Sequence, residues 1–123
     1  MINSAVFLGS KKLGLNLFKA LYEADTTISW TVLCPTDLND TRTYFSEFQE
    51  YAKLKNLDLL TANSPAMIEQ YVLDNQPDVM LVCGYYRILS KRLLDNVTFG
   101  VWGFHNSLLP KYRGGSPLVW QLI

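Results

Sequence analysis

Short apolar runs that alternate with segments of helical period constrain the fold of this chain most strongly. The runs are residues 5–8, 28–34, 57–60, 79–83 and 97–102. Between them, apolar side chains recur at helical spacing, which predicts helices over residues 11–23, 40–56, 64–75 and 90–94. Strands of a parallel sheet are buried on both faces and are joined by helices. The sequence therefore predicts an α/β, Rossmann-like three-layer domain with a mostly parallel sheet.

Polar residues mark where the predicted helices begin. Asp40 follows a polar loop and is expected to be the N-cap of the second helix. Ser64 and Pro65 predict the start of the third helix, with serine as N-cap and proline at the first helical position. Ser90 is expected to cap a short helix that ends near Leu94. Each helix should then present an apolar face to the sheet.

Composition limits the kind of protein that this can be. The 123 residues suffice for one domain, which we take as residues 1–123. Lys plus Arg and Asp plus Glu number 11 each, and this balance argues against a nucleic-acid-binding face. The first residues lack the features of a signal peptide, and no apolar run approaches the roughly 20 residues that span a bilayer. We therefore expect a cytoplasmic protein without membrane contact.

Ligands of parallel α/β sheets bind outside the carboxyl ends of the strands, where connections leave in opposite directions. Here the predicted strands end at Gly9–Ser10, at Cys83–Gly84 and before His105. The residues after the first strand, 9–14, lack one glycine of the dinucleotide fingerprint, and no acidic residue ends the second strand. A dinucleotide site is therefore disfavoured. Cys34 and Cys83 lie at strand ends without metal-ligand or redox spacing, and we interpret them as buried structural thiols.

The segment of residues 103–117 has the composition of a functional loop. It contains His105, the single histidine of the chain, followed by a turn signal, two leucines, a proline, two cations and a glycine pair. A connecting loop is usually short and polar, whereas this one combines an ionisable ring, apolar residues and charge. The sequence therefore predicts that a site is built around His105. Trp102, Tyr112 and Trp120 are expected to be packing residues.

The same segment resembles the signature of the folate-dependent formyltransferases, which reads roughly Asn-x-His-x-Ser-Leu-Leu-Pro-x-Tyr-Arg-Gly. Residues 105–114 match it at His, Ser, Leu, Leu, Pro, Tyr, Arg and Gly. Residues 5–14 and 79–89 are also similar to the family's first strand and to its pterin-binding segment. The wording around His105 is closest to the sugar N-formyltransferases, which are related to methionyl-tRNA formyltransferase.

The resemblance implies a reaction and a set of site residues. N10-formyltetrahydrofolate would be the co-substrate, its formyl carbon would be attacked by a substrate amine, and His105 would be the catalytic residue that stabilises the oxyanion. The amine would belong to an amino sugar attached to a nucleotide. Donor-binding positions would be Tyr85, Tyr86, Arg87, Ile88 and Leu89. Substrate-binding positions would be Ser10, Asn106, Ser107, Leu109, Arg113 and Gly114.

Two departures from the family pattern bear on activity. Gly103 stands where the family has a catalytic Asn, and no counterpart of the family's later Asp occurs through Ile123. The expected domain is therefore C-terminally incomplete, with impaired transfer and self-association through uncovered apolar surface. Three alternatives stay open: a catalytically silent domain that binds folate or sugar nucleotide, an inactive remnant, and a protein like methionyl-tRNA formyltransferase.

Overall fold

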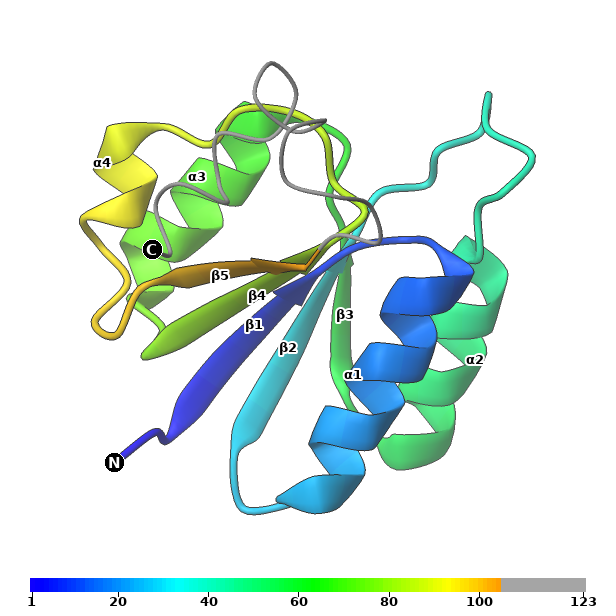
Figure 1. The fold of residues 1–123 in the computed structure, drawn as a ribbon, viewed down its shortest axis with the longest axis horizontal. Coiled ribbons are helices and arrows are strands. Elements are labelled where there is room, and N and C mark those ends of the chain that lie inside the picture. The colour runs from blue at the N-terminus through cyan, green and yellow to red at the C-terminus, as the bar shows by residue number, and fades with distance from the viewer. Residues whose placement is uncertain (105–123) are drawn as a thin grey trace.

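The computed structural model describes residues 1–104, which form a parallel sheet with helices on both faces (Figure 1). The strands are β1 (Ser4–Leu8), β2 (Ser29–Cys34), β3 (Asp58–Thr61), β4 (Val79–Cys83) and β5 (Val101–Phe104). They lie in the order β3-β2-β1-β4-β5, and every neighbouring pair is parallel. The helices are α1 (Lys12–Ala24), α2 (Phe45–Lys55), α3 (Pro65–Asn75) and α4 (Lys91–Leu94). The predicted α/β class and the alternation of elements are confirmed.

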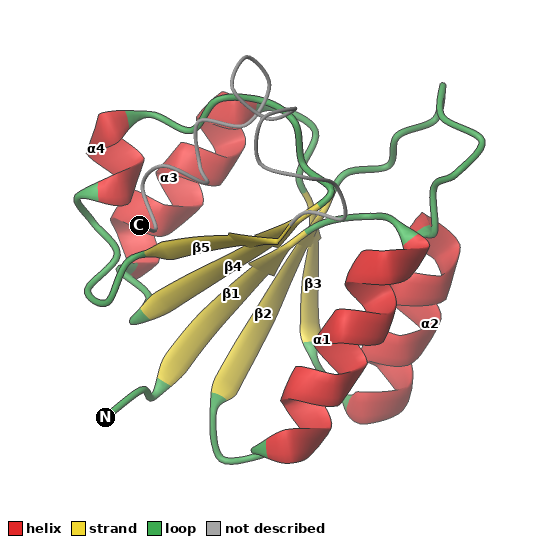
Figure 2. Cartoon of the chain, viewed as in Figure 1, coloured by secondary structure: helices red, strands yellow, loops and turns green. Residues whose placement is uncertain are grey.

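Alternate residues of each central strand divide the core into two layers. Val6 and Leu8 of β1 pack with Ile68 and Val72 of α3 on one face of the sheet. Ala5 and Phe7 point to the other face, which α1 and α2 cover. Figure 2 shows these helix pairs on opposite sides of the strands. β1 after Ser4 and all of β4 are apolar, as suits strands that are buried on both faces.

An aromatic cluster fills the layer between the sheet and α1 and α2. Phe18 of α1 is 1% exposed, and its ring centroid lies 5.3 Å from that of Phe7 and 5.4 Å from that of Trp30. Phe7 also stacks on Phe48 of α2 at 5.9 Å. Such ring separations fall in the favourable range for aromatic pairs. The cluster therefore fixes α1 and α2 against the central strands.

The expected caps of α3 and α4 are confirmed, but that of α2 is wrong. Ser64 Oγ accepts a hydrogen bond from the Met67 amide at 3.1 Å, and Ser90 Oγ accepts one from the Leu93 amide at 3.0 Å. Asp40 does not cap α2, because its carboxylate is bound by the Arg42 amide and guanidinium. The helix begins at Phe45, and the preceding Tyr44 amide donates to the Ser10 carbonyl at 2.6 Å. Contacts with a segment distant in sequence therefore place the start of the helix later than predicted.

The predicted start of the fifth strand is also wrong. Residues 97–100 form a turn in which the Gly100 amide donates to the Val97 carbonyl, and β5 begins only at Val101. Gly100 has φ +91°, a conformation that suits glycine. Val97 is buried in the core beside α3 and α4. Its apolar side chain therefore reflects core packing, although next to β5 it resembles the start of a strand. Within the described residues, β5 continues to Phe104, two residues beyond the predicted end at Trp102.

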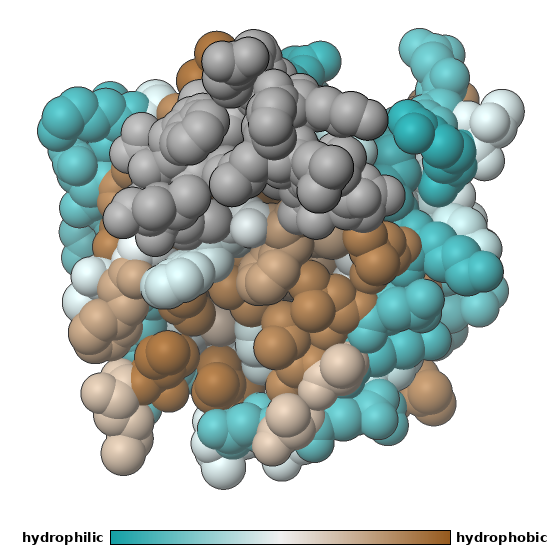
Figure 3. All heavy atoms as spheres, viewed as in Figure 1, coloured by the Kyte–Doolittle hydropathy of each residue, from teal (hydrophilic) through white to brown (hydrophobic). Residues whose placement is uncertain are grey.

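Apolar side chains remain uncovered beside the edge strand β5. Trp102 is 47% exposed, so the expectation that it is a packing residue is wrong; its Nε1 donates to the Phe99 carbonyl. Leu13 and Phe104 are exposed as well. Figure 3 shows apolar atoms on the sheet face beside α1. The self-association expected from the sequence stays a prediction, and this surface favours it. Among the described residues, no helix has the length and apolarity required to cross a bilayer.

Both cysteines are free and buried, as the interpretation as structural thiols requires. Burial raises the pKa of Cys34 to about 12 and also raises the pKa of Cys83. Because the thiolate is the reactive species, we expect iodoacetamide at pH 8 to leave both thiols unmodified in the native chain and to modify both in denaturant. Mass spectrometry of the adducts would measure this. Native alkylation as fast as that of the denatured chain would contradict the burial of the thiols.

Candidate functional site

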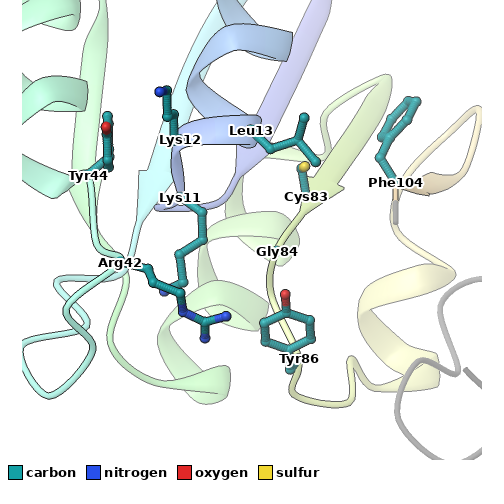
Figure 4. Close-up of a pocket in the computed structure, with 9 residues that line it drawn as sticks. All are labelled: Lys11, Lys12, Leu13, Arg42, Tyr44, Cys83, Gly84, Tyr86 and Phe104. Carbon is teal, nitrogen blue, oxygen red and sulfur yellow. The ribbon is translucent and has the colours of Figure 1, made fainter. Parts of the chain in front are cut away.

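A cavity of about 360 Å³ lies at the carboxyl ends of the central strands (Figure 4). From β1 the chain proceeds through α1 toward β2, whereas from β4 it proceeds through α4 toward β5 on the other side. The ends of β1 and β4 are therefore the point where the connections diverge, at which such sheets bind ligands. The residues that line the cavity are Lys11, Lys12, Leu13, Arg42, Tyr44, Cys83, Gly84, Tyr86 and Phe104.

Two glycines bring the backbone segments around the cavity into close contact. A Cβ on Gly9 would collide with the carbonyl oxygen of Cys83, so glycine is what lets the ends of β1 and β4 approach one another. Gly84 has φ +78°, a conformation that residues with a side chain rarely adopt. A Cβ there would lie 3.1 Å from Cγ of Lys11. The wall of the cavity therefore depends on missing side chains at two strand ends.

A network of charged groups connects the end of β1 to the loop after β2. Lys11 Nζ lies 2.5 Å from Oδ2 of Asp37 and 3.2 Å from Oδ2 of Asp40, and the Lys11 side chain is only 14% exposed. The Ser10 hydroxyl also donates to Asp37. Burial opposes ionisation of Asp37, but the hydrogen bonds from Lys11 and Ser10 hold its pKa below the usual value. The carboxylate is therefore charged at neutral pH.

Asp40 extends the network to Arg42 at the cavity. The guanidinium donates from Nε at 3.0 Å and from a terminal nitrogen at 2.9 Å, one bond to each carboxylate oxygen. These hydrogen bonds hold the pKa of Asp40 far below its usual range and raise the pKa of Arg42. The sequence predicts only a polar loop before Asp40 and does not predict this network. The place of that loop after β2, at the same edge as the other strand ends, was the signal that could have revealed it.

The predicted donor-binding residues follow β4, but they do not share one hollow. Tyr86 lines the cavity, while Arg87 lines a second hollow beside residues 36–40. Ile88 and Leu89 border a third, against the start of α3. The Tyr85 hydroxyl is buried without a hydrogen-bond partner among the described residues, and burial raises its pKa. The segment thus lies at the predicted edge of the sheet and presents its side chains in several directions.

The remaining predicted site residues divide between the strand ends and the part beyond Phe104. Ser10 is buried, and its hydroxyl is occupied by Asp37. Gly103 pairs with Val82 in register, so it belongs to the face that α3 and α4 cover, whereas Phe104 lines the cavity on the opposite face. Outside the described residues lie His105, Asn106, Ser107, Leu109, Arg113 and Gly114. Their roles stay predictions.

The chain is similar in sequence to curated formyltransferases. Curated methionyl-tRNA formyltransferases from Malacoplasma penetrans and Finegoldia magna are each 30% identical to the chain, over 121 and 127 residues. These alignments cover 96% and 100% of the chain but 38% and 41% of the relatives. The counterpart from Prochlorococcus marinus is 37% identical over 75 residues, which cover 61% of the chain and 22% of that relative.

The chain thus spans about two fifths of the length of the first two relatives. Residues 10–123 also match the sequence family described as formyl transferase, a range that includes the cavity-lining residues and the segment around His105. The cavity at the ends of β1 and β4 and this match over most of the sequence lead to one assignment: the chain belongs to the formyl transferase family.

Proposed function

We propose that this chain carries the part of an N-formyltransferase that binds the formyl donor and the amine acceptor. The acceptor nitrogen attacks the formyl carbon of N10-formyltetrahydrofolate, the bond from that carbon to N10 breaks, and N10 gains the proton that the amine loses. The observation that carries the proposal is the coincidence of the family match with a cavity at the diverging strand ends. His105, directly after β5, donates to the oxyanion that forms during attack.

The geometry favours donor and acceptor sites on different faces of the strand ends. Tyr85 and Leu89 pack against the core beside α3 and α4, and Gly103 belongs to the same face. The cavity with Lys11, Arg42 and Tyr86 opens beside the start of α1. We assign the folate to the side of the Tyr85–Leu89 segment that Tyr85 and Leu89 form, and the acceptor to the cavity that Tyr86 lines. The reacting atoms would then meet at the end of β5.

For the acceptor, the charge pattern favours a small molecule, an amino sugar attached to a nucleotide. Of the cations Lys11, Lys12 and Arg42 that line the cavity, two are neutralised by ion pairs: Lys11 with Asp37 and Arg42 with Asp40. Binding of a polyanion draws on many unpaired cations, and the chain as a whole has a formal net charge of zero. A nucleotide carries few charges and would require only a local contact, for which Arg113 is the candidate.

A second acceptor, methionyl-tRNA, is favoured by the comparisons. The relatives from Malacoplasma penetrans and Finegoldia magna are both named methionyl-tRNA formyltransferases, and both alignments cover nearly the whole chain. Both acceptors present a primary amine, so the formyl-transfer step is the same. They differ in the surface that must contact the rest of the substrate.

A formyl-transfer assay with the two acceptor classes would test these proposals. The chain is incubated with N10-formyltetrahydrofolate and either nucleoside-diphosphate amino sugars or methionyl-tRNA, and products are measured by mass spectrometry. We expect formylated amino sugar at a trace level from the chain as given, and more of it from a Gly103→Asn variant. Formylmethionyl-tRNA as the faster product would establish the second acceptor. Absence of both products, also from a Gly103→Asn variant, would overturn the assignment of a transfer site.

A further inference from the structure

We propose that Lys11 is a positioning residue that holds the loop of residues 36–44 at the cavity and thereby sets the affinity for the acceptor. This inference rests on the proposed function, because it assigns the acceptor to the cavity. It assigns a positioning role to Lys11, whose ammonium group is paired with carboxylates of the protein itself. Lys11 would act through Asp37, Asp40 and Arg42 rather than by touching the acceptor with its ammonium group.

The ammonium group of Lys11 has an oxygen neighbour inside the protein for each of its N–H donors. Nζ contacts Asp37 at 2.5 Å, Asp40 at 3.2 Å and Ser10 Oγ at 3.3 Å. An ammonium has three N–H donors, which these three oxygens match. The aliphatic stem is packed as well, since a Cβ on Gly84 would lie 3.1 Å from Lys11 Cγ. The side chain thus fills the space between the ends of β1, β2 and β4.

The loop of residues 36–44 contains no helix or strand, and α2 begins only at Phe45. At its start, the amide and hydroxyl of Thr36 donate to Asn63 Oδ1 at 2.9 and 3.1 Å. The attachments of its far end lie beside Lys11: Lys11 and Thr43 form an isolated antiparallel bridge, and the Tyr44 amide donates to the Ser10 carbonyl. Within the loop, Thr43 Oγ1 donates to the Thr36 carbonyl at 3.0 Å. Removing the cation would leave Asp37 and Asp40 to repel one another at the point of attachment.

The loop in turn delivers Arg42 to the cavity. Asp40 binds the guanidinium with both oxygens, and the same carboxylate faces Lys11. Figure 4 shows the Arg42 guanidinium pointing toward the Tyr86 ring, with the end of the Lys11 side chain next to Arg42. Tyr44, at the end of the loop, lines the cavity too. A shift of the loop would therefore move two cavity-lining side chains together.

Replacement of Lys11 by methionine tests the proposal, because methionine keeps much of the stem and removes the charge. Hydrogen–deuterium exchange should become faster at the amides of residues 36–44 and stay unchanged in β1 and β4. Titration calorimetry should show binding of a nucleoside-diphosphate amino sugar weakened by about tenfold, a misplacement effect, with folate binding unchanged. Lys11→Arg should restore most of the affinity, since it keeps the charge.

Lys91→Met is the matched control. Lys91 pairs with Asp95 at 2.7 Å on the surface of α4, where the Lys91 side chain is 85% exposed. This variant should change neither exchange in residues 36–44 nor acceptor binding. Unchanged exchange there in Lys11→Met, or equal weakening of folate and acceptor binding, would overturn the positioning role. If the wild-type chain binds no acceptor, the proposed function fails, and the exchange experiment alone decides whether Lys11 holds the loop.

Discussion

Replacing Gly103 by asparagine should raise the rate of formyl transfer by about 10²–10³, the usual effect of one oxyanion donor. Glycine offers no side-chain donor, and on this ground we expect the chain as given to show no more than trace turnover. Gly103 lies in β5, one residue before Phe104, and it belongs to the sheet face on which Tyr85 and Leu89 pack. An amide side chain there would point to the face on which we place the folate.

The control is Gly103→Leu, which adds a side chain of similar size without a donor. It should leave transfer at the trace level, so a gain with both residues would indicate a packing effect. Rates of formylated product, followed by mass spectrometry at saturating donor, give the comparison. Turnover of the unmodified chain near about 1 per second, an ordinary enzyme rate, would show that the missing donor is replaced elsewhere and would contradict this account.

Replacing Phe18 by alanine should lower the free energy of unfolding by about 3–5 kcal/mol, the range for a buried aromatic side chain. Phe18 is 1% exposed and contacts Phe7, Trp30 and Tyr51 in the aromatic cluster. Its removal leaves a cavity between α1 and the sheet that rigid rings cannot fill. Because the free energy of unfolding of native proteins is only about 5–15 kcal/mol, this single change should remove a large fraction of it.

Phe99→Ala is the matched control for the same chemical truncation. Phe99 is 51% exposed, and its recorded bond to Trp102 uses the backbone carbonyl, which alanine keeps. We expect a loss of no more than about 1 kcal/mol, because little apolar area leaves contact. Urea unfolding followed by circular dichroism would measure both variants. Equal losses in the two would show that the aromatic cluster does not dominate the stability of the fold.

Local signals predicted most of the fold, and they failed where distant contacts decide the structure. The apolar strand at residues 79–83 and the cap at Ser64 depend on neighbours in sequence, and both are confirmed. Asp40 looked like an N-cap, but Lys11 and Arg42 bind its carboxylate instead. Val97 looked like strand because it is buried. Neither the ion pair between Lys11 and Asp40 nor the burial of Val97 can be predicted without the folded arrangement of β1, the loop after β2, and α4.

The location of the site could be predicted better than its composition. The rule that parallel sheets bind ligands at diverging strand ends pointed to Gly9 and Gly84, and the cavity lies there. The ion network of Lys11, Asp37 and Asp40 could not be predicted, because it joins segments that are separated in sequence by a whole helix and strand. The resemblance around His105 indicated the family, which the comparison over residues 10–123 shows.

Mapping where a formyl folate binds tests the proposed donor site after β4 most directly. Hydrogen–deuterium exchange is measured with and without N5-formyltetrahydrofolate, a stable isomer of the proposed donor. The account predicts slower exchange at residues 84–89, after β4, and no change at residues 25–28 and 76–78, which precede β2 and β4 at the opposite edge of the sheet. Unchanged exchange throughout, or slowing confined to the opposite edge, would contradict the proposed donor site.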